Sequence, residues 1–148
     1  YSFDFYMETK NVAVAYDTTA GSFSRFGGRL YVAYTGGGGT NTDVFVAYSD
    51  DNGTNWSFPV RVNSDTLADN FSEGRRVQYQ PSITVDPATG TVVVSWYDVS
   101  FDASLTRANT FVATSIDGGD SFSPGAPLNQ KKFALDAITG NRVELETV

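Results

Sequence analysis

The chain has 148 residues, a formal net charge of −7, and neither cysteine nor histidine. These absences exclude disulfides, thiolate and imidazole metal sites and Ser–His catalysis, and the negative charge disfavours nucleic acid as a partner. No apolar run approaches the length of a membrane-spanning segment, so we expect no membrane insertion.

Short runs rich in Val, Thr, Tyr and Phe, separated by turn-forming residues, recur along the sequence and predict an all-β fold. In the first half these runs cover residues 12–17, 28–34, 44–48 and 58–63. In the second half they recur at residues 81–87, 90–98, 110–114 and 123–129. Each half therefore predicts four strands that turns join into an antiparallel sheet.

One octapeptide occurs twice, each time directly after a strand-like run. The first copy spans Ser49 to Trp56 and the second, which starts 66 residues later (115 minus 49), spans Ser115 to Phe122. We call them the first and the second box, and both read Ser-x-Asp-x-Gly-x-polar-aromatic. The defining residues are Ser49, Asp51, Gly53 and Trp56 in the first box, and Ser115, Asp117, Gly119 and Phe122 in the second.

The residue types of the boxes suit a tight turn. The Asp carboxylate can accept hydrogen bonds from backbone N–H groups a few residues on, and the Gly adopts a positive φ at little cost. The aromatic side chain can fold back over the hairpin and bury its apolar surface. We therefore interpret the box carboxylates as structural.

The boxes resemble the Asp-box, or bacterial neuraminidase repeat, of sialidases and other β-propellers. The second copy fits that pattern at every defining position, with Phe122 in place of the commoner Trp, whereas the first carries Asn55 where Thr or Ser is usual. Each box also lies between a β-run and a strand that contains proline. The resemblance implies four-stranded antiparallel blades of a sialidase-like β-propeller.

We expect a single domain over residues 1–148, with one blade at about 10–63, a second at about 78–129 and the start of a further blade at about 130–148. A closed propeller needs roughly four to eight blades of ~40–50 residues. The ring is therefore expected to be incomplete. The expected partners are the remaining blades of the same polypeptide or neighbouring subunits.

Ligands of propellers usually bind at the rim opposite the box turns, so the resemblance points there for a carbohydrate site. The candidate residues are Arg75, Arg76, Tyr79 and Gln80 at the entry to one inner strand, Trp96 and Asp98 at the exit of the next strand, and Arg107 in the following loop. The alternatives are structural. The two arginines are more typical of a solvated loop than of a carboxylate clamp, and Trp96 and Asp98 are more typical of packing between blades than of a ligand site.

A sialidase would use such residue types: arginines bind a sugar carboxylate, a tyrosine beside a glutamate acts as nucleophile and an aspartate as acid/base. The three-arginine cluster and the Arg-Ile-Pro motif of the family are not visible in this sequence. We assign no catalytic residue.

Calcium is the one candidate cofactor. Hard cations take six to eight oxygen ligands, and acidic residues gather most suggestively at Asp98 and Asp102. No run matches the loop of an EF-hand.

The leading functional hypothesis is a segment of a larger secreted or cell-surface protein that binds glycans or serves as a scaffold. The extracellular location rests on composition, since acidic, cysteine-free β repeats rich in Thr, Asn and Gly are typical of such proteins. One alternative is a sialidase-type glycoside hydrolase whose catalytic residues lie partly outside this chain. Another is a structural surface module that assembles through its sheet edges.

Overall fold

The structure, a computed structural model, describes residues 11–21, 23–37, 42–64, 77–100, 102, 107–131 and 133–134. The regular elements within these ranges are all β-strands. The same ranges contain no helix with the length and apolar character needed to span a membrane.

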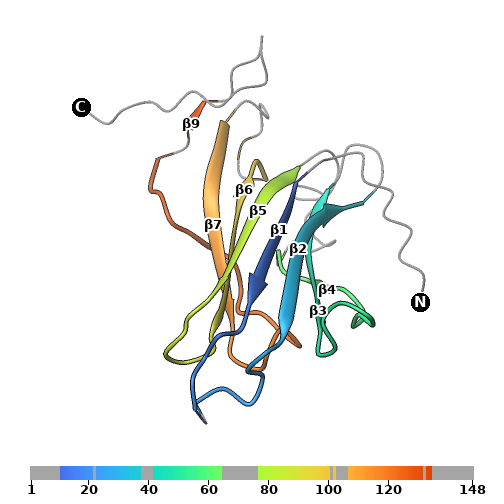
Figure 1. The fold of residues 1–148 in the computed structure, drawn as a ribbon. Coiled ribbons are helices and arrows are strands. Elements are labelled where there is room, and N and C mark those ends of the chain that lie inside the picture. The colour runs from blue at the N-terminus through green and yellow to red at the C-terminus, as the bar shows by residue number, and fades with distance from the viewer. Residues whose placement is uncertain are drawn as a thin grey trace.

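The first sheet, or first blade, has four antiparallel strands in the order β1-β2-β3-β4 (Figure 1). Its strands are β1 (Val12–Tyr16), β2 (Leu30–Gly36), β3 (Asp43–Ser49) and β4 (Val60–Arg61). Because the order in space is the order in the chain, each strand pairs with the next through a local connection.

The second blade repeats this order as β5-β6-β7-β8. Its strands are β5 (Gln78–Val85), β6 (Val92–Asp98), β7 (Arg107–Ser115) and β8 (Ala126–Pro127). A short further strand, β9 (Phe133–Ala134), pairs with the first two residues of β7.

The predicted fold class is confirmed: the chain forms antiparallel four-stranded blades, and each box lies in the connection between the third and fourth strands. The residue limits that the sequence suggested for the units stay a prediction. Most of the further blade expected at 130–148 lies outside the described residues.

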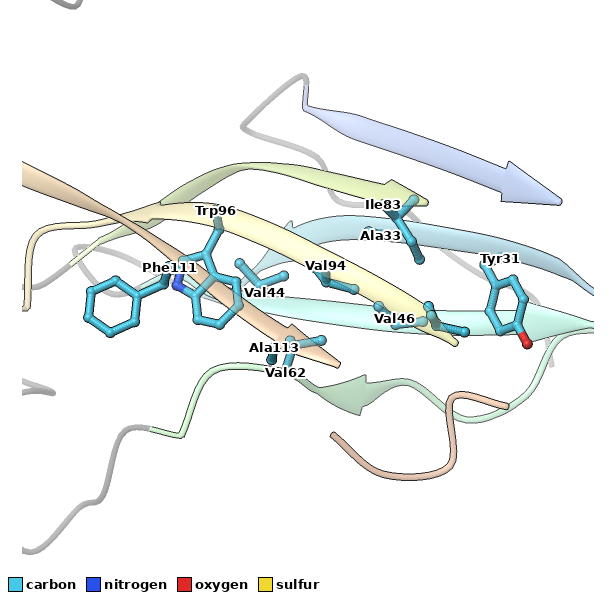
Figure 2. Packing of buried hydrophobic residues seen from close by; sticks show 11 residues of the cluster. Tyr31, Ala33, Val44, Val46, Val62, Ile83, Val94, Trp96, Phe111 and Ala113 are labelled. Atoms are coloured by element: carbon cyan, nitrogen blue, oxygen red, sulfur yellow. The ribbon is translucent and has the colours of Figure 1, made fainter. Parts of the chain in front are cut away.

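The two blades pack face to face over one shared apolar core (Figure 2). Side chains alternate between the two faces of a strand, so each blade turns one set of residues towards the other. The first blade contributes Tyr31, Ala33, Val44, Val46 and Val62, and the second contributes Ile83, Val92, Val94, Trp96, Phe111 and Ala113. Trp96 is 2% exposed and stacks on Phe111, with ring centroids 5.9 Å apart.

The blades also join at the rim opposite the boxes. The backbone N–H of Gln78, at the start of β5, donates to the carbonyl of Thr42 at 3.0 Å. The Thr42 hydroxyl donates in return to the Gln78 carbonyl at 2.7 Å. This pair of bonds places Thr42, which directly precedes β3, beside Gln78 at the start of the second blade.

Candidate functional site

The first box closes its turn through its serine and aspartate side chains. The Ser49 hydroxyl donates to Asp51 Oδ1 at 2.8 Å and accepts from the backbone N–H of Gly53 at 2.8 Å. The same carboxylate accepts from the backbone N–H of Asn55 at 2.8 Å. Trp56 folds back so that its indole N–H donates to the Gly53 carbonyl at 3.0 Å. The turn therefore satisfies its own polar groups.

The second box repeats this hydrogen-bond pattern. The Ser115 hydroxyl donates to Asp117 Oδ1 at 2.7 Å and accepts from the backbone N–H of Gly119 at 2.8 Å. Ser121 takes the place of Asn55, and its backbone N–H donates to Asp117 Oδ1 at 3.0 Å. Gly119 has a φ of 95°, a conformation that glycine adopts without strain.

Hydrogen bonds hold the box aspartates in their charged form. Bonds from the backbone and side chain of Asn55, with a further bond from Ser49, lower the pKa of Asp51 to about 2. Burial raises the pKa of Asp117, but bonds from Ser121 and Ser115 outweigh burial and lower it to about 2. Both groups are carboxylates at neutral pH, and neither is tuned towards proton transfer.

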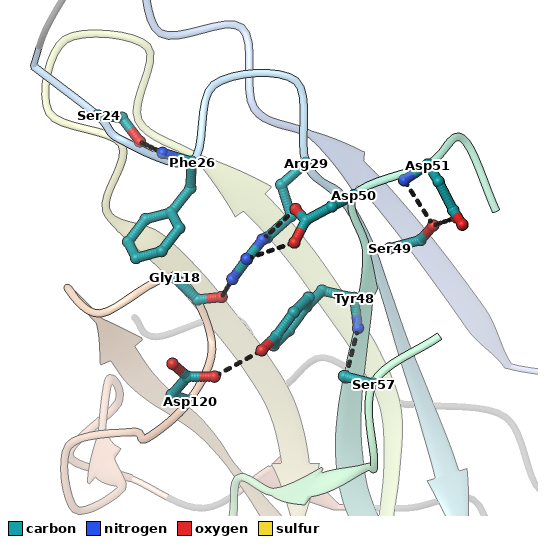
Figure 3. A network of polar contacts seen from close by, with 10 residues as sticks. All are labelled: Ser24, Phe26, Arg29, Tyr48, Ser49, Asp50, Asp51, Ser57, Gly118 and Asp120. Carbon is teal, nitrogen blue, oxygen red and sulfur yellow. Dashed lines mark hydrogen bonds and ion pairs between the residues drawn. The ribbon is translucent and has the colours of Figure 1, made fainter. Parts of the chain in front are cut away.

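Arg29 links the two boxes across the blade interface (Figure 3). Its Nε and Nη2 atoms donate to the two carboxylate oxygens of Asp50, each at 2.7 Å, and its Nη1 atom donates to the Gly118 carbonyl at 2.8 Å. The Arg29 side chain is only 9% exposed. A fork that binds a carboxylate on one side and a carbonyl on the other suits arginine alone among the cations.

Aromatic rings surround this arginine. Its guanidinium carbon lies 3.7 Å from the centroid of the Tyr48 ring and 4.5 Å from that of Phe26. The Tyr48 hydroxyl donates to Asp120 of the second box at 2.8 Å (Figure 3). The box rim therefore joins the blades through a polar cluster as well as through apolar packing.

Sequence reasoning missed this cluster and four further structural residues. Ser57 and Ser123 accept from the backbone N–H groups of the third strands with their hydroxyls, each at 3.0 Å. The side chains of Asn63 and Asn129 accept from the third strands in the same way, at 2.8 and 2.7 Å. Both pairs carry the same 66-residue spacing as the boxes (123 minus 57 and 129 minus 63), which is the signal that could have found them.

At the opposite rim, Trp96 and Asp98 lie against each other, and both side chains are buried. Asp98 is 3% exposed, and its carboxylate accepts from the indole N–H of Trp96 at 3.2 Å. It also accepts from the backbone N–H of Ser100 at 2.7 Å, from the Ser100 hydroxyl and from the Gln78 side chain at 3.4 Å. This carboxylate is engaged by the chain itself.

Arg107 and Asp102 form an ion pair at the same rim. Asp102 is 2% exposed and accepts from Nε, Nη2 and the backbone N–H of Arg107 at 3.1, 2.8 and 3.0 Å. The Arg107 side chain is 54% exposed. One side of its guanidinium is therefore held while the rest faces solvent.

Gln80 is the most unusual residue of this rim. It is exposed and has a φ of 50°, at an irregularity in the pairing of β5 with β6. Gln80 directly precedes Pro81, and a residue before proline normally adopts an extended backbone conformation. A non-glycine residue at positive φ costs on the order of 1–3 kcal/mol. Its neighbour Tyr79 packs on Tyr97, with ring centroids 5.5 Å apart.

The other predicted site residues are only partly placed. Arg75 and Arg76 lie outside the described residues, so their role in the rim stays a prediction. Among the described residues, no three acidic side chains converge in the manner of a metal site. Calcium at Asp98 and Asp102 likewise stays a prediction, and any ion there would compete with the bonds that these carboxylates already accept.

No family model and no curated protein matches the chain. A leech intramolecular trans-sialidase in complex with 2,7-anhydro-Neu5Ac resembles it with a TM-score of 0.51 and 23% identity, over 79% of this chain and 14% of the trans-sialidase. The Hadza microbial sialidase Hz136 resembles it with a TM-score of 0.59 and 19% identity, over 78% of this chain and 25% of the sialidase.

These similarities concern the fold. The chain spans a quarter or less of the length of either sialidase, and the identities are those at which architecture alone is shared. Together with the two antiparallel blades, they show that the chain has the fold of a sialidase-like β-propeller segment.

Proposed function

We propose that this chain is a scaffolding segment of an Asp-box β-propeller that belongs to a larger secreted or cell-surface protein. The observation that carries the proposal is that its best-placed acidic side chains are hydrogen-bonded within the chain. The carboxylates of Asp51, Asp117, Asp98 and Asp102 all accept hydrogen bonds from the chain itself. Groups committed in this way stabilise turns and rims rather than serve a substrate.

The Asp-box assignment is supported by the matched geometry of the two boxes. In both, the serine hydroxyl accepts from the glycine N–H at 2.8 Å and donates to the aspartate. The extracellular location is supported by composition, with a net charge of −7 and no cysteine. The partners proposed for a scaffold of this kind are further blades.

The scaffold proposal is tested by thermal unfolding of the intact polypeptide that carries the chain, in EDTA and in millimolar Ca²⁺. We expect the same melting temperature in both, because the rim carboxylates are satisfied by protein donors. A Ca²⁺-dependent rise that D98N abolishes, and that D117N leaves in place, would overturn the scaffold proposal for this rim and establish the calcium site instead.

Carbohydrate binding at the opposite rim is the second candidate function. It is favoured by two exposed groups on one rim, the strained Gln80 and the half-exposed guanidinium of Arg107. Strained backbone gathers at ligand sites, and a guanidinium suits a sugar carboxylate.

A glycan array with the intact polypeptide tests this second candidate, with R107A as the variant and R25A as the matched control. Arg25 is an exposed arginine near the box rim. If the rim binds carbohydrate, R107A loses the signal and R25A keeps it; silence on the array would reject this function. A fluorogenic sialoside in the same series would reveal a sialidase-type hydrolase.

A further inference from the structure

The first box contains the only Asn-Gly sequence of the chain, Asn52-Gly53. Asn52 is exposed to solvent. The amide of an asparagine is chemically labile, because the backbone nitrogen of the next residue can attack its side-chain carbon. Glycine as that next residue has no side chain to hinder the attack. Asn52 and Gly53 therefore carry the groups needed for a covalent modification of the box.

The reaction is a cyclisation followed by hydrolysis, with water as its only co-reactant. The Gly53 nitrogen loses its proton and forms a bond to Cγ of Asn52, while the bond from Cγ to Nδ2 breaks and ammonia leaves with that proton. Water then opens the cyclic imide. Cleavage of the new bond to Cγ gives aspartate, and cleavage of the original bond to the Asn52 backbone carbonyl carbon gives isoaspartate.

The geometry of the two boxes explains why the asparagine stands in the first. The residue before the box glycine has a positive φ in both, 58° at Asn52 and 77° at Gly118. Asparagine tolerates this conformation better than most residues with a side chain. In the second box, a Cβ on Gly118 would lie 2.7 Å from the Phe26 ring, so only glycine fits there. Of the two boxes, the first alone carries the labile amide.

The box serine holds the nitrogen that would attack. The Gly53 N–H donates to the Ser49 hydroxyl at 2.8 Å. Ser49 is 2% exposed, and its hydroxyl donates to Asp51 Oδ1 at 2.8 Å, which leaves an oxygen lone pair for Gly53. Because the N–H of this hydrogen bond points at Ser49, the bond must break before the nitrogen can turn towards Cγ of Asn52.

The box tryptophan holds Gly53 on its other side. The Gly53 carbonyl accepts from the indole N–H of Trp56 at 3.0 Å. A Cβ built on Gly53 would lie 3.6 Å from the Trp56 ring, so the ring lies against this glycine. Rotation of the backbone at Gly53 would have to break this bond and displace the ring. Asn52 thus faces solvent while its reaction partner is fixed within the turn.

We propose that Asn52 is a deamidation site controlled by the first box. The amide does not react while Ser49 holds the Gly53 N–H, and it reacts when the turn opens. The inference goes beyond the proposed scaffold function, because it concerns the covalent chemistry of the turn and holds whatever the propeller binds.

The reaction would trap the first box in its open state. Both products place a third carboxylate beside those of Asp50 and Asp51, and like charges this close repel. Isoaspartate also lengthens the backbone of the turn by one methylene, which disturbs the contact of Ser49 with Gly53. Because Asp50 binds Arg29, we expect the modified chain to lose part of its stability at the box rim.

Peptide mapping by mass spectrometry tests the proposal on the intact polypeptide. The deamidated fraction at Asn52 is followed during incubation at mildly alkaline pH, and a synthetic peptide of residues 47–58 gives the unprotected rate. The polypeptide is made in a host without N-glycosylation, because Asn52-Gly53-Thr54 also reads as a glycan acceptor. We expect the folded chain to react at least about 10-fold more slowly than the peptide, since reaction requires local opening.

Two serine variants separate control by the box from a general loss of stability. S49A leaves the Gly53 N–H without its acceptor and should raise the rate at Asn52 on the order of 10-fold. S115A is the matched control: it removes the equivalent hydroxyl, from a serine that is also 2% exposed, in the second box. We expect S115A to leave the rate at Asn52 unchanged.

Equal rates for the folded chain and the peptide would overturn the proposal, and so would equal acceleration by S49A and S115A. An S49A variant that does not deamidate at Asn52 would also overturn it. If S49A fails to fold, the unmodified polypeptide in low concentrations of denaturant replaces it. Hydrogen exchange of the Gly53 amide and deamidation of Asn52 should then rise in parallel, and deamidation that does not follow this exchange would contradict the proposed control.

Discussion

At the scale of single residues, the box aspartates stabilise the fold by accepting hydrogen bonds rather than by pairing with cations. Asp51 and Asp117 each bind a serine hydroxyl and a backbone N–H four residues further on. A carboxylate that accepts several such bonds prefers its charged form strongly, which is the reason for the pKa of about 2 in both boxes.

This pKa depression predicts how stability depends on pH. The unfolded chain has ordinary aspartates with a pKa of about 3.9, and the folded pKa is about 2. A group whose pKa is lowered by folding contributes its full stabilisation above the unfolded value and loses it as the pH falls through the folded one. The box contribution should therefore be complete above about pH 4 and disappear towards pH 2.

D117N tests this account. Removing the charge weakens the bonds from Ser115 and Ser121, so we expect the free energy of unfolding at pH 7 to fall by about 2 kcal/mol. The loss of stability between pH 4 and pH 2 should be smaller in D117N than in the unmodified protein, with S121A intermediate. Urea unfolding across this pH range measures both effects. If D117N lost as much free energy of unfolding between pH 4 and pH 2 as the unmodified protein, the role given to the carboxylate would be refuted.

At the scale of elements, Arg29 is the side chain that links the two box turns directly, within the polar cluster that joins the blades at this rim. Arg29 binds Asp50 of its own blade and the Gly118 carbonyl of the other. Burial lowers its pKa, but the hydrogen bond and charge of Asp50 outweigh burial and raise it. The guanidinium thus fixes the relative position of the two box turns.

R29K should destabilise the protein although it conserves the charge. Lysine cannot bind both carboxylate oxygens and a carbonyl in one plane, so we expect a loss of about 2 kcal/mol. R25K is the control, because Arg25 is exposed and lies over the ring of Phe26; it should change stability by less than about 0.5 kcal/mol. Equal effects of R29K and R25K in chemical denaturation would contradict the proposed link.

The sequence predicted the strands and the box turns because their signals are local. Alternation of apolar residues and the Ser-x-Asp-x-Gly pattern act over a few residues, and the structure has strands where the runs were found. Arg29 could not be predicted in this way, since its partner Gly118 is 89 residues away. The burial of Trp96 and Asp98 also depends on how the blades pack, so the sequence left packing and ligand binding as alternatives for both.

At the scale of the whole molecule, the blades share one core and should therefore unfold together. Among the described residues, Trp96 is the largest fully buried side chain, and it lies between the blades (Figure 2). W96A should lower the free energy of unfolding by about 3–5 kcal/mol. The transition should stay single, since neither sheet keeps a complete core without the other. Two separate transitions in calorimetry of W96A would show instead that the blades are independent.

The two blades pack so that the second box lies against aromatic residues of the first blade. A Cβ built on Gly118 would lie 2.7 Å from the Phe26 ring, and one built on Gly119 would lie 3.3 Å from the Tyr31 ring. Nuclear Overhauser measurements on the chain test this contact directly. We expect cross-peaks between the Hα protons of both glycines and these rings, with ring-current shifts for Gly118. Cross-peaks within each sheet but none between the glycines and these rings would contradict it.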